Sequence, residues 1–562
     1  MLRCNHTIIA SRFQPHTRIT WFLFAVLICA VSWIFFSTLS GHLLDSHDIE
    51  TFRDHIAISE DFSFFFSPDR ELALRPADTL FKWLVFLIWG NEPTWYHWLC
   101  VGIHGLNALL LASLFRNFGL SLELSMMAGL LFLINVGHYE VIHWITALSY
   151  SMAMSCGFAA LIVYVRFLAA RQTSQYLAFC GFLITGLMFH PAIASLWLLA
   201  LQWSWRNGVR TMTALRWLIP PVLLFACLLV LILPTEPRQT NFLESMQIRG
   251  SLETIEIILG AGRICLWLLS RLVTTAHWLP LSMYELAPWE LWLGASILSC
   301  LAILIWKNSP VGSLAAFWIL FSVLPFLLLA EKVFLAYLPA GPPRYLYIAS
   351  AGVSLLLAWI ITVASNFFSS GRYIKVVLLT ALVFSSYFAM KKAEALSLYT
   401  SSRSYHINSD LKNAAHQLRR AIERGRDVLD QEDAQMRLCL LAMGLDENSD
   451  AVVDAALDQF PQNSTLRFYK LALESMSADS MKNRLAVGQI EAASTDPYIL
   501  QASFRKVMAQ AYHHLGLGFD TRDDFGGAVV AYRRALIFSP EQQNIAKRLT
   551  MSLSRLASTN KR

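Results

Sequence analysis

Long apolar runs alternate with short polar breaks over roughly the first 390 residues of the chain. Runs of about 18 or more apolar residues are long enough to cross a bilayer as helices. The later sequence mixes apolar and charged positions as water-soluble helices do. We therefore expect an all-α fold class, with a polytopic transmembrane bundle over residues 1–390 and a soluble helical domain over residues 391–562. The pattern predicts about eleven spans, near residues 20–40, 94–115, 122–137, 147–168, 175–190, 191–205, 213–233, 288–306, 311–330, 345–367 and 373–390.

Two apolar segments contain spaced charges and fit the span pattern less well. They are "DTLFKWLVFLIWG" and "SLETIEIILGAGRICLWLLSRLV". Apolar helices with one polar face lie in the membrane interface, and we predict this arrangement for both. If one of them were a true span, the count would change. The run from Gln175 to Trp205 is divided at "FHPA", and counting it as two spans keeps the arginine-rich breaks on one side.

The charged residues support a membrane protein and suggest its orientation. Only 15% of the residues are charged, against about 25% in soluble domains, and the net charge is +6. This positive charge follows the positive-inside bias and needs no nucleic-acid partner. With a cytoplasmic N-terminus, segments 41–93, 235–287 and 331–344 lie outside together with the C-terminal domain, although Lys391 and Lys392 argue against that side for the domain. The basic residues of the alternate breaks are Arg116, Arg166, Arg171, Arg206, Arg210, Arg216, Lys307, Arg372 and Lys375.

The nine cysteines form no CxxC pair, and most lie within apolar runs. They are typical of small buried apolar residues and not of a disulfide framework or a zinc site. The first apolar run, "WFLFAVLICAVSWIFFSTL", is too long for the core of a signal peptide, and no small-residue cleavage pattern follows it. We expect it to be retained as a membrane anchor.

One window of the C-terminal sequence matches a tetratricopeptide repeat. In that repeat, small residues let two helices approach, aromatic residues fill the groove between them, and a proline ends the second helix. Segments upstream, such as "AVVDAALDQFPQNS", match less well. Helical arrays of this kind present interaction surfaces, so we expect the domain to bind a partner protein. The matching residues are Tyr512, Leu515, Gly516, Phe519, Ala528, Tyr532, Ala535 and Pro540.

Ionisable residues gather in the segments predicted to lie at one membrane face. A charge at the centre of a span costs roughly 2.5–3.5 kcal/mol on insertion scales, so such groups tend to line an aqueous cavity. Transfer of a sugar from a lipid phosphate to a hydroxyl needs a base for the acceptor and cations for the departing phosphate. A divalent metal could assist, but no ligand spacing demands one. The candidates are Asp45, Asp48, Glu50, Asp54, Glu60, Asp61, Arg75, His97, His104, His138, Glu140, His143 and Arg344.

Five blocks of the sequence resemble a known family. They are "HDIETFRDHIAI", "LRPADTLF", "GNEPTWYHWLCVGIHGLNALLL", "INVGHYEVIHWITALS" and "PPRYLYIASAGVSLLLAW". In this order, and followed by the repeats, they resemble blocks of the membrane C-type glycosyltransferases, especially the O-mannosyltransferase-like group with C-terminal tetratricopeptide repeats. The sequence departs from the family at His47, Cys100 and Gly137, where an Asp, an Asn and a Pro are typical, and Leu148 to Tyr150 lack an expected Arg.

The resemblance implies an inverting glycosyltransferase that moves a hexose, such as mannose, from a polyprenyl phosphate to a hydroxyl. It implies Asp48 as the base, and Glu50 could substitute for it because it lies only two residues away. Each role has a simpler alternative: a solvated carboxylate, a histidine hydrogen-bonded between helices, or an arginine reaching to the interface. The residues implied to surround donor and acceptor are Arg75, His97, His104, His138, Glu140 and Arg344.

The implied partners are a polyprenyl-phosphate-linked sugar, membrane lipid, and an acceptor protein bound by the repeats. We expect an integral membrane protein, with a bacterial inner membrane and a periplasmic repeat domain favoured over the endoplasmic reticulum. A transporter is disfavoured, because the ionisable residues gather at one face and not at the midplane. Because His47 replaces an Asp of the family pattern, the alternative function is a non-catalytic membrane scaffold that uses its repeats for protein assembly.

Overall fold

The computed structural model describes residues 15–36, 46–67, 75–232, 254–274, 288–328, 344–368 and 371–475, apart from 408, 427–428 and 446–447, together with most of 509–559. The regular elements in these ranges are all helices. The chain forms two compact units: unit 1 comprises Met1–Asn408 and Glu423–Leu429, and unit 2 comprises Ser409–Ile422 and Asp430–Arg562. The division expected after residue 390 falls inside α18 (Gly371–Ile407), which continues without a break.

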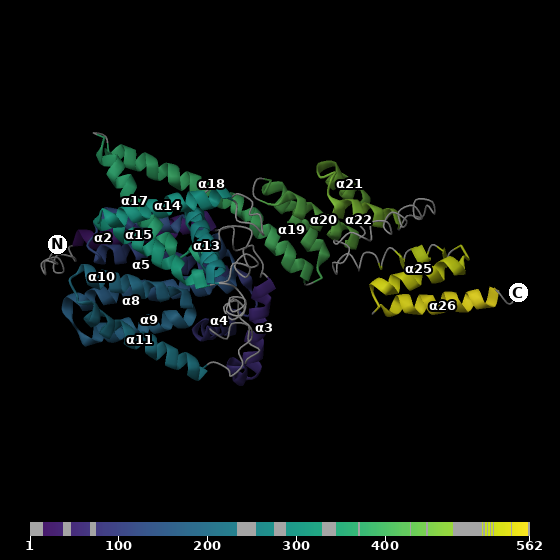
Figure 1. The fold of residues 1–562 in the computed structure, drawn as a ribbon, viewed down its shortest axis with the longest axis horizontal. Helices are drawn as coiled ribbons and strands as arrows, with labels where there is room; N and C mark the ends of the chain where they lie inside the picture. Colours follow the sequence, from purple (N-terminus) through teal and green to yellow (C-terminus); the bar gives the residue numbers. More distant parts are fainter. Residues whose placement is uncertain are drawn as a thin grey trace. The chain divides into compact units, whose positions relative to one another are not determined.

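Unit 1 contains the long apolar helices (Figure 1). Among the described residues, eight helices are long and apolar enough to cross a membrane, and a bent pair raises the count to nine. The pair is α6 (Leu122–Leu133) with segment Val136–His143, and its bend is 52°. These helices are consistent with an integral membrane protein. The eight are found in α2 (Pro15–Phe36), α5 (Pro93–Asn117), α8 (Leu148–Ala170), α11 (Thr211–Ile232), α14 (Pro288–Trp306), α15 (Pro310–Val323), α17 (Ala349–Asn366) and α18.

The segment predicted as two short spans forms α9 (Thr173–Phe189) and α10 (Ser195–Arg206), which contain 17 and 12 residues. A 3-10 helix, η6 (Pro191–Ala194), joins them at the "FHPA" break. α9 packs along α8 and α11, and α10 packs along α11 and α15. The chain therefore divides where the sequence predicted, but both helices are shorter than the eight candidate spans. The predicted count of eleven depends on counting both.

Basic residues from the alternate breaks lie at one end of the bundle. Arg166 donates to Asn117 Oδ1 at 3.4 Å, where α8 and α5 end. Arg206 donates to the carbonyl oxygen of Pro310 at 3.2 Å, where α10 ends and α15 begins. We call this the basic end. The charge pattern thus indicated correctly which helix termini lie near one another.

The opposite end of the bundle carries α3 (Ser46–Glu60) and α4 (Pro76–Trp89), which pack on each other (Figure 1). The sequence places Asp48 in an outer segment without predicting its local structure, and the structure forms a helix there. Asp48 lies in the first turn, where a carboxylate stabilises a helix through its dipole. Phe52 and His55 follow on the same face, and all three are buried. The many charges between these positions hid the buried face in the sequence.

α4 is the first predicted interfacial helix. It buries charged and polar side chains and exposes apolar ones, the reverse of a surface helix in a soluble protein. Arg75 is its N-cap, and Pro76 occupies the first helical position, which suits a residue without an N–H. The face turned toward the protein contains Asp78, Thr79, Lys82 and Val85. The exposed face contains Leu80, Leu84, Leu87 and Ile88. An apolar surface of this kind suits contact with lipid, whereas the charged groups need partners inside the protein.

The second predicted interfacial segment forms α13 (Thr254–Thr274), which packs closely against α14. A Cβ added at Gly294 of α14 would lie only 1.9 Å from the carbonyl oxygen of Leu266. Arg271 and Glu290 form a buried ion pair across the same contact, with 2.5 Å between Nη2 and Oε1. The glycine lets the two backbones approach, and the ion pair satisfies the charges that this approach buries.

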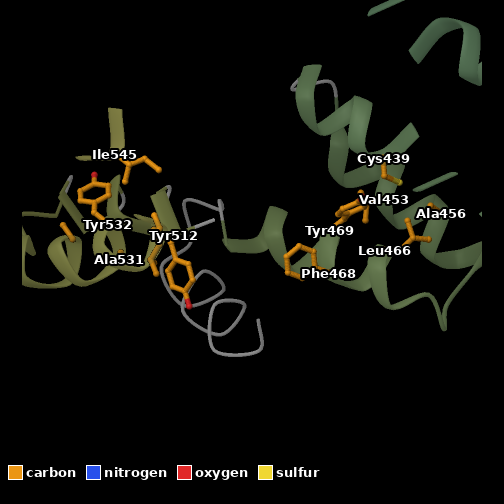
Figure 2. Packing of buried hydrophobic residues seen from close by; sticks show 13 residues of the cluster. Cys439, Val453, Ala456, Leu466, Phe468, Tyr469, Tyr512, Ala531, Tyr532 and Ile545 are labelled. Atoms are coloured by element: carbon orange, nitrogen blue, oxygen red, sulfur yellow. The ribbon is translucent and has the colours of Figure 1, made fainter. Parts of the chain in front are cut away.

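Unit 2 contains helical hairpins, formed by α19 (Leu411–Arg424) except its last two residues, α20 (Gln431–Leu445), α21 (Ser449–Gln459), α22 (Ser464–Ser475), α25 (Phe525–Phe538) and α26 (Gln543–Thr559). Figure 2 shows residues of its buried apolar cluster, including Val453, Tyr469 and Tyr532. A Cβ added at Gly516 would lie 2.4 Å from Tyr532 Cε1, so this glycine lets the aromatic ring pack against its helix. The repeat pattern predicts this contact, and its assignment as a tetratricopeptide repeat stays a prediction.

Candidate functional site

Residues 138–150 cross the end of the bundle between α6 and α8, and we call them the connecting segment. They contain the end of η4 (Val136–His138), α7 (Tyr139–His143), η5 (Ile145–Ala147) and the start of α8. Asn135 starts this irregular stretch, because its side chain accepts the backbone N–H of Gly137 at 2.8 Å. Short helices replace a regular α-helix here. Their terminal N–H and C=O groups have no partners within the helix, so they can contact α3 and α4.

The connecting segment fixes the predicted base, Asp48. This carboxylate is 1% exposed. Its Oδ1 accepts the backbone N–H of Thr146 at 2.7 Å and the hydroxyl of Thr146 at 2.6 Å. Hydrogen bonds to an ionised acceptor are short and strong, so these two hold the carboxylate in one orientation. The side chain of Glu50, the alternative base, lies outside the described residues.

Lys82 of α4 approaches the same threonine from the other side. Its Nζ donates to the carbonyl oxygen of Thr146 at 2.9 Å and to Asp78 Oδ2 at 2.9 Å. The side chains of Lys82 and Asp78 are 1% and 0% exposed. A buried lysine is tolerated only when its charge is paired, and here the pair also clamps the backbone that holds Asp48.

Arg344 is anchored by two other residues of the connecting segment. It begins η8 (Arg344–Leu346), where its backbone N–H and its Nη1 donate to the two carboxylate oxygens of Glu140 at 2.6 and 2.5 Å. Its guanidinium carbon lies 4.8 Å from the ring centroid of Trp144. The side chain is 15% exposed, so Arg344 is held inside and does not reach outward to the interface. Glu140 orients this arginine, and the substrate contact predicted for Glu140 stays a prediction.

Arg75 and a histidine that the sequence interpretation did not select complete this group. Arg75 donates through Nη1 to Ser149 Oγ at 3.3 Å. The ring of the following residue, Tyr150, lies 3.7 Å from the ring of His190. His190 caps η6 by accepting a backbone N–H through Nδ1. Burial and, after it, nearby positive charges hold the pKa of His190 well below its usual range.

Two predicted histidines have protein partners in the core of the bundle. His104 contacts the Tyr347 hydroxyl through Nδ1 and the carbonyl oxygen of Leu133 through Nε2, both at 3.0 Å. A carbonyl only accepts, so Nε2 carries the proton and Nδ1 accepts from the tyrosine. His138 contacts Ser350 Oγ through Nε2. These contacts favour the alternative that both histidines join helices, with His104 completing the end of α6.

The remaining candidates have different surroundings: Asp54 is buried, Glu60 is exposed, and Asp45 lies outside the described residues. The ring of His97 stacks on that of His143, with 5.7 Å between centroids, so it also meets the connecting segment. Asp61 is exposed and caps η3 (Phe62–Phe66). The hydroxyl and the backbone N–H of Ser63 donate to Asp61 and hold the pKa of this carboxyl below its usual range. Asp61 therefore has a local structural role.

In the ranges that the structure describes, no three His, Cys, Asp or Glu side chains are grouped so that they could hold a metal ion. The charged groups that meet the connecting segment are the carboxylates Asp48 and Glu140 and the cations Arg75, Lys82 and Arg344. This end can therefore present a fixed base together with hydrogen-bond donors for an anion.

Sequence reasoning missed Thr146, Ser149, Lys82 and His190. The first two are small polar residues in "WITALS", and the only available signal was their position inside one of the family-like blocks. Lys82 is a single charge in the apolar stretch "LFKWLV", and His190 lies at the "FHPA" break, where a polar residue interrupts a span.

No protein-family model, curated protein or solved structure matches this chain.

Proposed function

We propose that this chain is an inverting glycosyltransferase that moves a sugar from a polyprenyl phosphate to a hydroxyl group of an acceptor protein. The observation that carries the proposal is the Asp48 carboxylate, which is buried and held by Thr146. Arg75 and Arg344 are attached to the same connecting segment. A base in one orientation beside anchored cations, at the end of an apolar bundle, suits a reaction between a lipid-borne phosphate and a hydroxyl.

In this reaction the acceptor oxygen attacks the anomeric carbon from the face opposite the phosphate. The bond between that carbon and the phosphate oxygen breaks, and the polyprenyl phosphate leaves with both bonding electrons. The acceptor proton passes to Asp48, and a single displacement inverts the anomeric configuration. Arg75 and Arg344 stabilise the negative charge that grows on the departing phosphate.

The membrane arrangement belongs to the same proposal. Eleven helices cross the bilayer, including the short α9 and α10, and the basic end faces the cytoplasm. The end with α3 and α4 and the whole of unit 2 then face outward, into the periplasm of a bacterium. Unit 2 acts as a tetratricopeptide-like array that binds the acceptor protein. The inward-facing charges of α4, with leucines on its outer face, support its position at the membrane interface.

The test compares Asp48→Asn with wild type in membranes that receive radiolabelled polyprenyl-phosphate hexoses, mannose first, and extracted proteins. Asn keeps the size of the side chain and can still accept from Thr146 through its amide oxygen, but it cannot take the acceptor proton. We expect labelled protein with wild type and a loss of at least a hundredfold with Asp48→Asn, the lower range for a general base.

The matched control is Asp61→Asn, a change of the same chemistry at an exposed cap of the neighbouring helix. It should leave labelling within about twofold of wild type, because the Asp61 side chain hydrogen-bonds only to Ser63 among the described residues. Equal labelling by wild type and Asp48→Asn, at equal expression, would remove the base from the proposal. Labelling by neither, with every donor hexose tried, would favour the scaffold function.

A further inference from the structure

His190 is held as a neutral imidazole with its proton on one defined nitrogen. Its Nδ1 accepts the backbone N–H of Ala192 at 3.1 Å, so Nδ1 carries a lone pair. A neutral imidazole has one N–H, which must then be at Nε2. Pro191 follows directly and fixes the backbone at the start of η6. The local sequence "FHPA" therefore presents a single, oriented N–H donor.

This donor has no acceptor in the part of the chain that the structure describes. His190 is 5% exposed, and its Nε2 is buried without a hydrogen-bond partner there. Buried donors are nearly always satisfied in native proteins, so one without a partner calls for a ligand or an ordered water. The neighbouring ring of Tyr150 packs against the imidazole and keeps it in place.

Three cations act electrostatically on His190: Arg75, Arg344 and Lys82. Lys82 is neutralised by Asp78, and Arg344 is neutralised by Glu140. 

Arg75 differs from these two cations. Its guanidinium donates to the hydroxyl of Ser149 and forms no ion pair with any carboxylate among the described residues. A guanidinium offers five N–H donors in a planar fork, of which this contact uses one. Among the described residues, Arg75 therefore carries a positive charge that no carboxylate pairs, and this charge acts on His190 with its buried N–H donor. An anion with several oxygens would satisfy both.

We propose that His190 and Arg75 form an anion-binding subsite in which Nε2–H of His190 and the Arg75 fork donate to the oxygens of one phosphoryl group. The two-oxygen geometry of a phosphate matches a guanidinium, and the neutral imidazole adds a third donor without adding charge. Identifying that phosphate as the one carried by the lipid donor rests on the proposed function. The subsite itself rests on the contacts of the two residues.

The experiment measures binding and needs no sugar transfer. The full chain, purified in detergent, is titrated with farnesyl phosphate by calorimetry, and farnesol serves as the probe without a phosphate. Inorganic phosphate and phosphatidylglycerol are separate arms, which distinguish a free phosphate and a general anionic headgroup from a prenyl phosphate. Wild type should bind farnesyl phosphate and should not bind farnesol at the same concentrations.

Two variants separate the role of His190 as a helix cap, through Nδ1, from its proposed role as a hydrogen-bond donor, through Nε2. His190→Asn keeps an oxygen that can accept the N–H of Ala192, but it has no group at the position of Nε2. His190→Gln places its amide nitrogen near that position and keeps a donor. We expect the dissociation constant for farnesyl phosphate to rise about tenfold with His190→Asn and to stay within about threefold with His190→Gln. A merely structural histidine would not show this difference.

The supporting variants test whether the ring packing of His190 or the charge of Arg75 accounts for binding. His190→Phe keeps the ring contact with Tyr150 and loses both nitrogens, and it should weaken binding as much as His190→Asn. Arg75→Gln should weaken binding at least tenfold. Arg116→Gln, a matched change at the basic end, should leave it unchanged.

The outcomes distinguish this inference from the proposed function. Wild-type affinity in both His190→Asn and His190→Phe, with unchanged melting temperatures, would overturn the subsite even if sugar transfer were found. Absence of binding by wild type to every phosphate probe would also overturn it. Weaker binding in these variants without any sugar transfer would establish the anion subsite and refute the transferase. If the His190 variants weakened the binding of inorganic phosphate as much as that of farnesyl phosphate, the subsite would be assigned to free phosphate.

Discussion

Replacing Lys82 by Met should destabilise unit 1 more than the loss of an ordinary surface ion pair. Lys82→Met keeps most of the volume of the side chain but removes its charge. Asp78 is then left in a position that is 0% exposed without its 2.9 Å partner. Removing one member of a buried pair typically costs about 3–5 kcal/mol, because the other charge stays buried. The carbonyl oxygen of Thr146 also loses its donor.

A double variant and a matched control isolate the free-energy cost of leaving the Asp78 charge buried without Lys82. In Asp78→Asn/Lys82→Met both charges are gone, so the double variant should be more stable than Lys82→Met by about 1–3 kcal/mol. The control is Lys375→Met, because Lys375 lies 2.7 Å from Glu123, whose side chain is 68% exposed. Water can solvate that carboxylate, so the control should cost at most about 1 kcal/mol.

The assay is denaturant unfolding of the full chain in micelles, followed by tryptophan fluorescence. Similar midpoints for Lys82→Met and Lys375→Met would refute the reasoning, because burial would then add nothing to the value of the pair. A double variant that is less stable than Lys82→Met would also refute it. In that case the Asp78 carboxylate would stabilise the protein through contacts other than the one with Lys82.

Three further predictions concern other parts of the chain. Burial, with a smaller contribution from a neighbouring lysine charge, lowers the pKa of His55 to about 3, so this histidine is neutral in the folded protein. Its contribution to stability should be complete above pH 6.5 and fall by up to about 1.4 kcal/mol per pH unit below it. Unfolding titrations of His55→Phe should therefore show a shallower fall in stability than those of wild type. Gly294→Ala should weaken the contact of α13 with α14 and lower the melting temperature, whereas Gly262→Ala, which adds a methyl to open space on α13, should raise or keep it. Gly516→Ala should loosen the packing of Tyr532 in unit 2, which limited proteolysis of the full chain would detect as faster cleavage there. An unchanged cleavage rate would contradict the close packing of this glycine.

The sequence by itself determined the elements of the bundle. Apolar runs fixed where the long helices lie, because a run of that length can satisfy its backbone in lipid only as a helix. The break at "FHPA" became the η6 turn, and Pro76 began α4. The alternation of basic residues indicated which helix ends lie together, and Arg166 and Arg206 confirm it. These are local properties, encoded within one or two turns of chain.

The site depends on contacts between residues that are distant in sequence. Asp48 was selected from its block, but the residue that holds it, Thr146, lies 98 positions later. Lys82 looks in the sequence like a lysine that reaches into water, and it turns inward only because the leucines of α4 occupy the outer face. A hydroxyl or an amine carries no sign of its partner, since its role is set by what the fold brings within about 3 Å. Tertiary structure therefore decided which polar residues of this apolar chain act together.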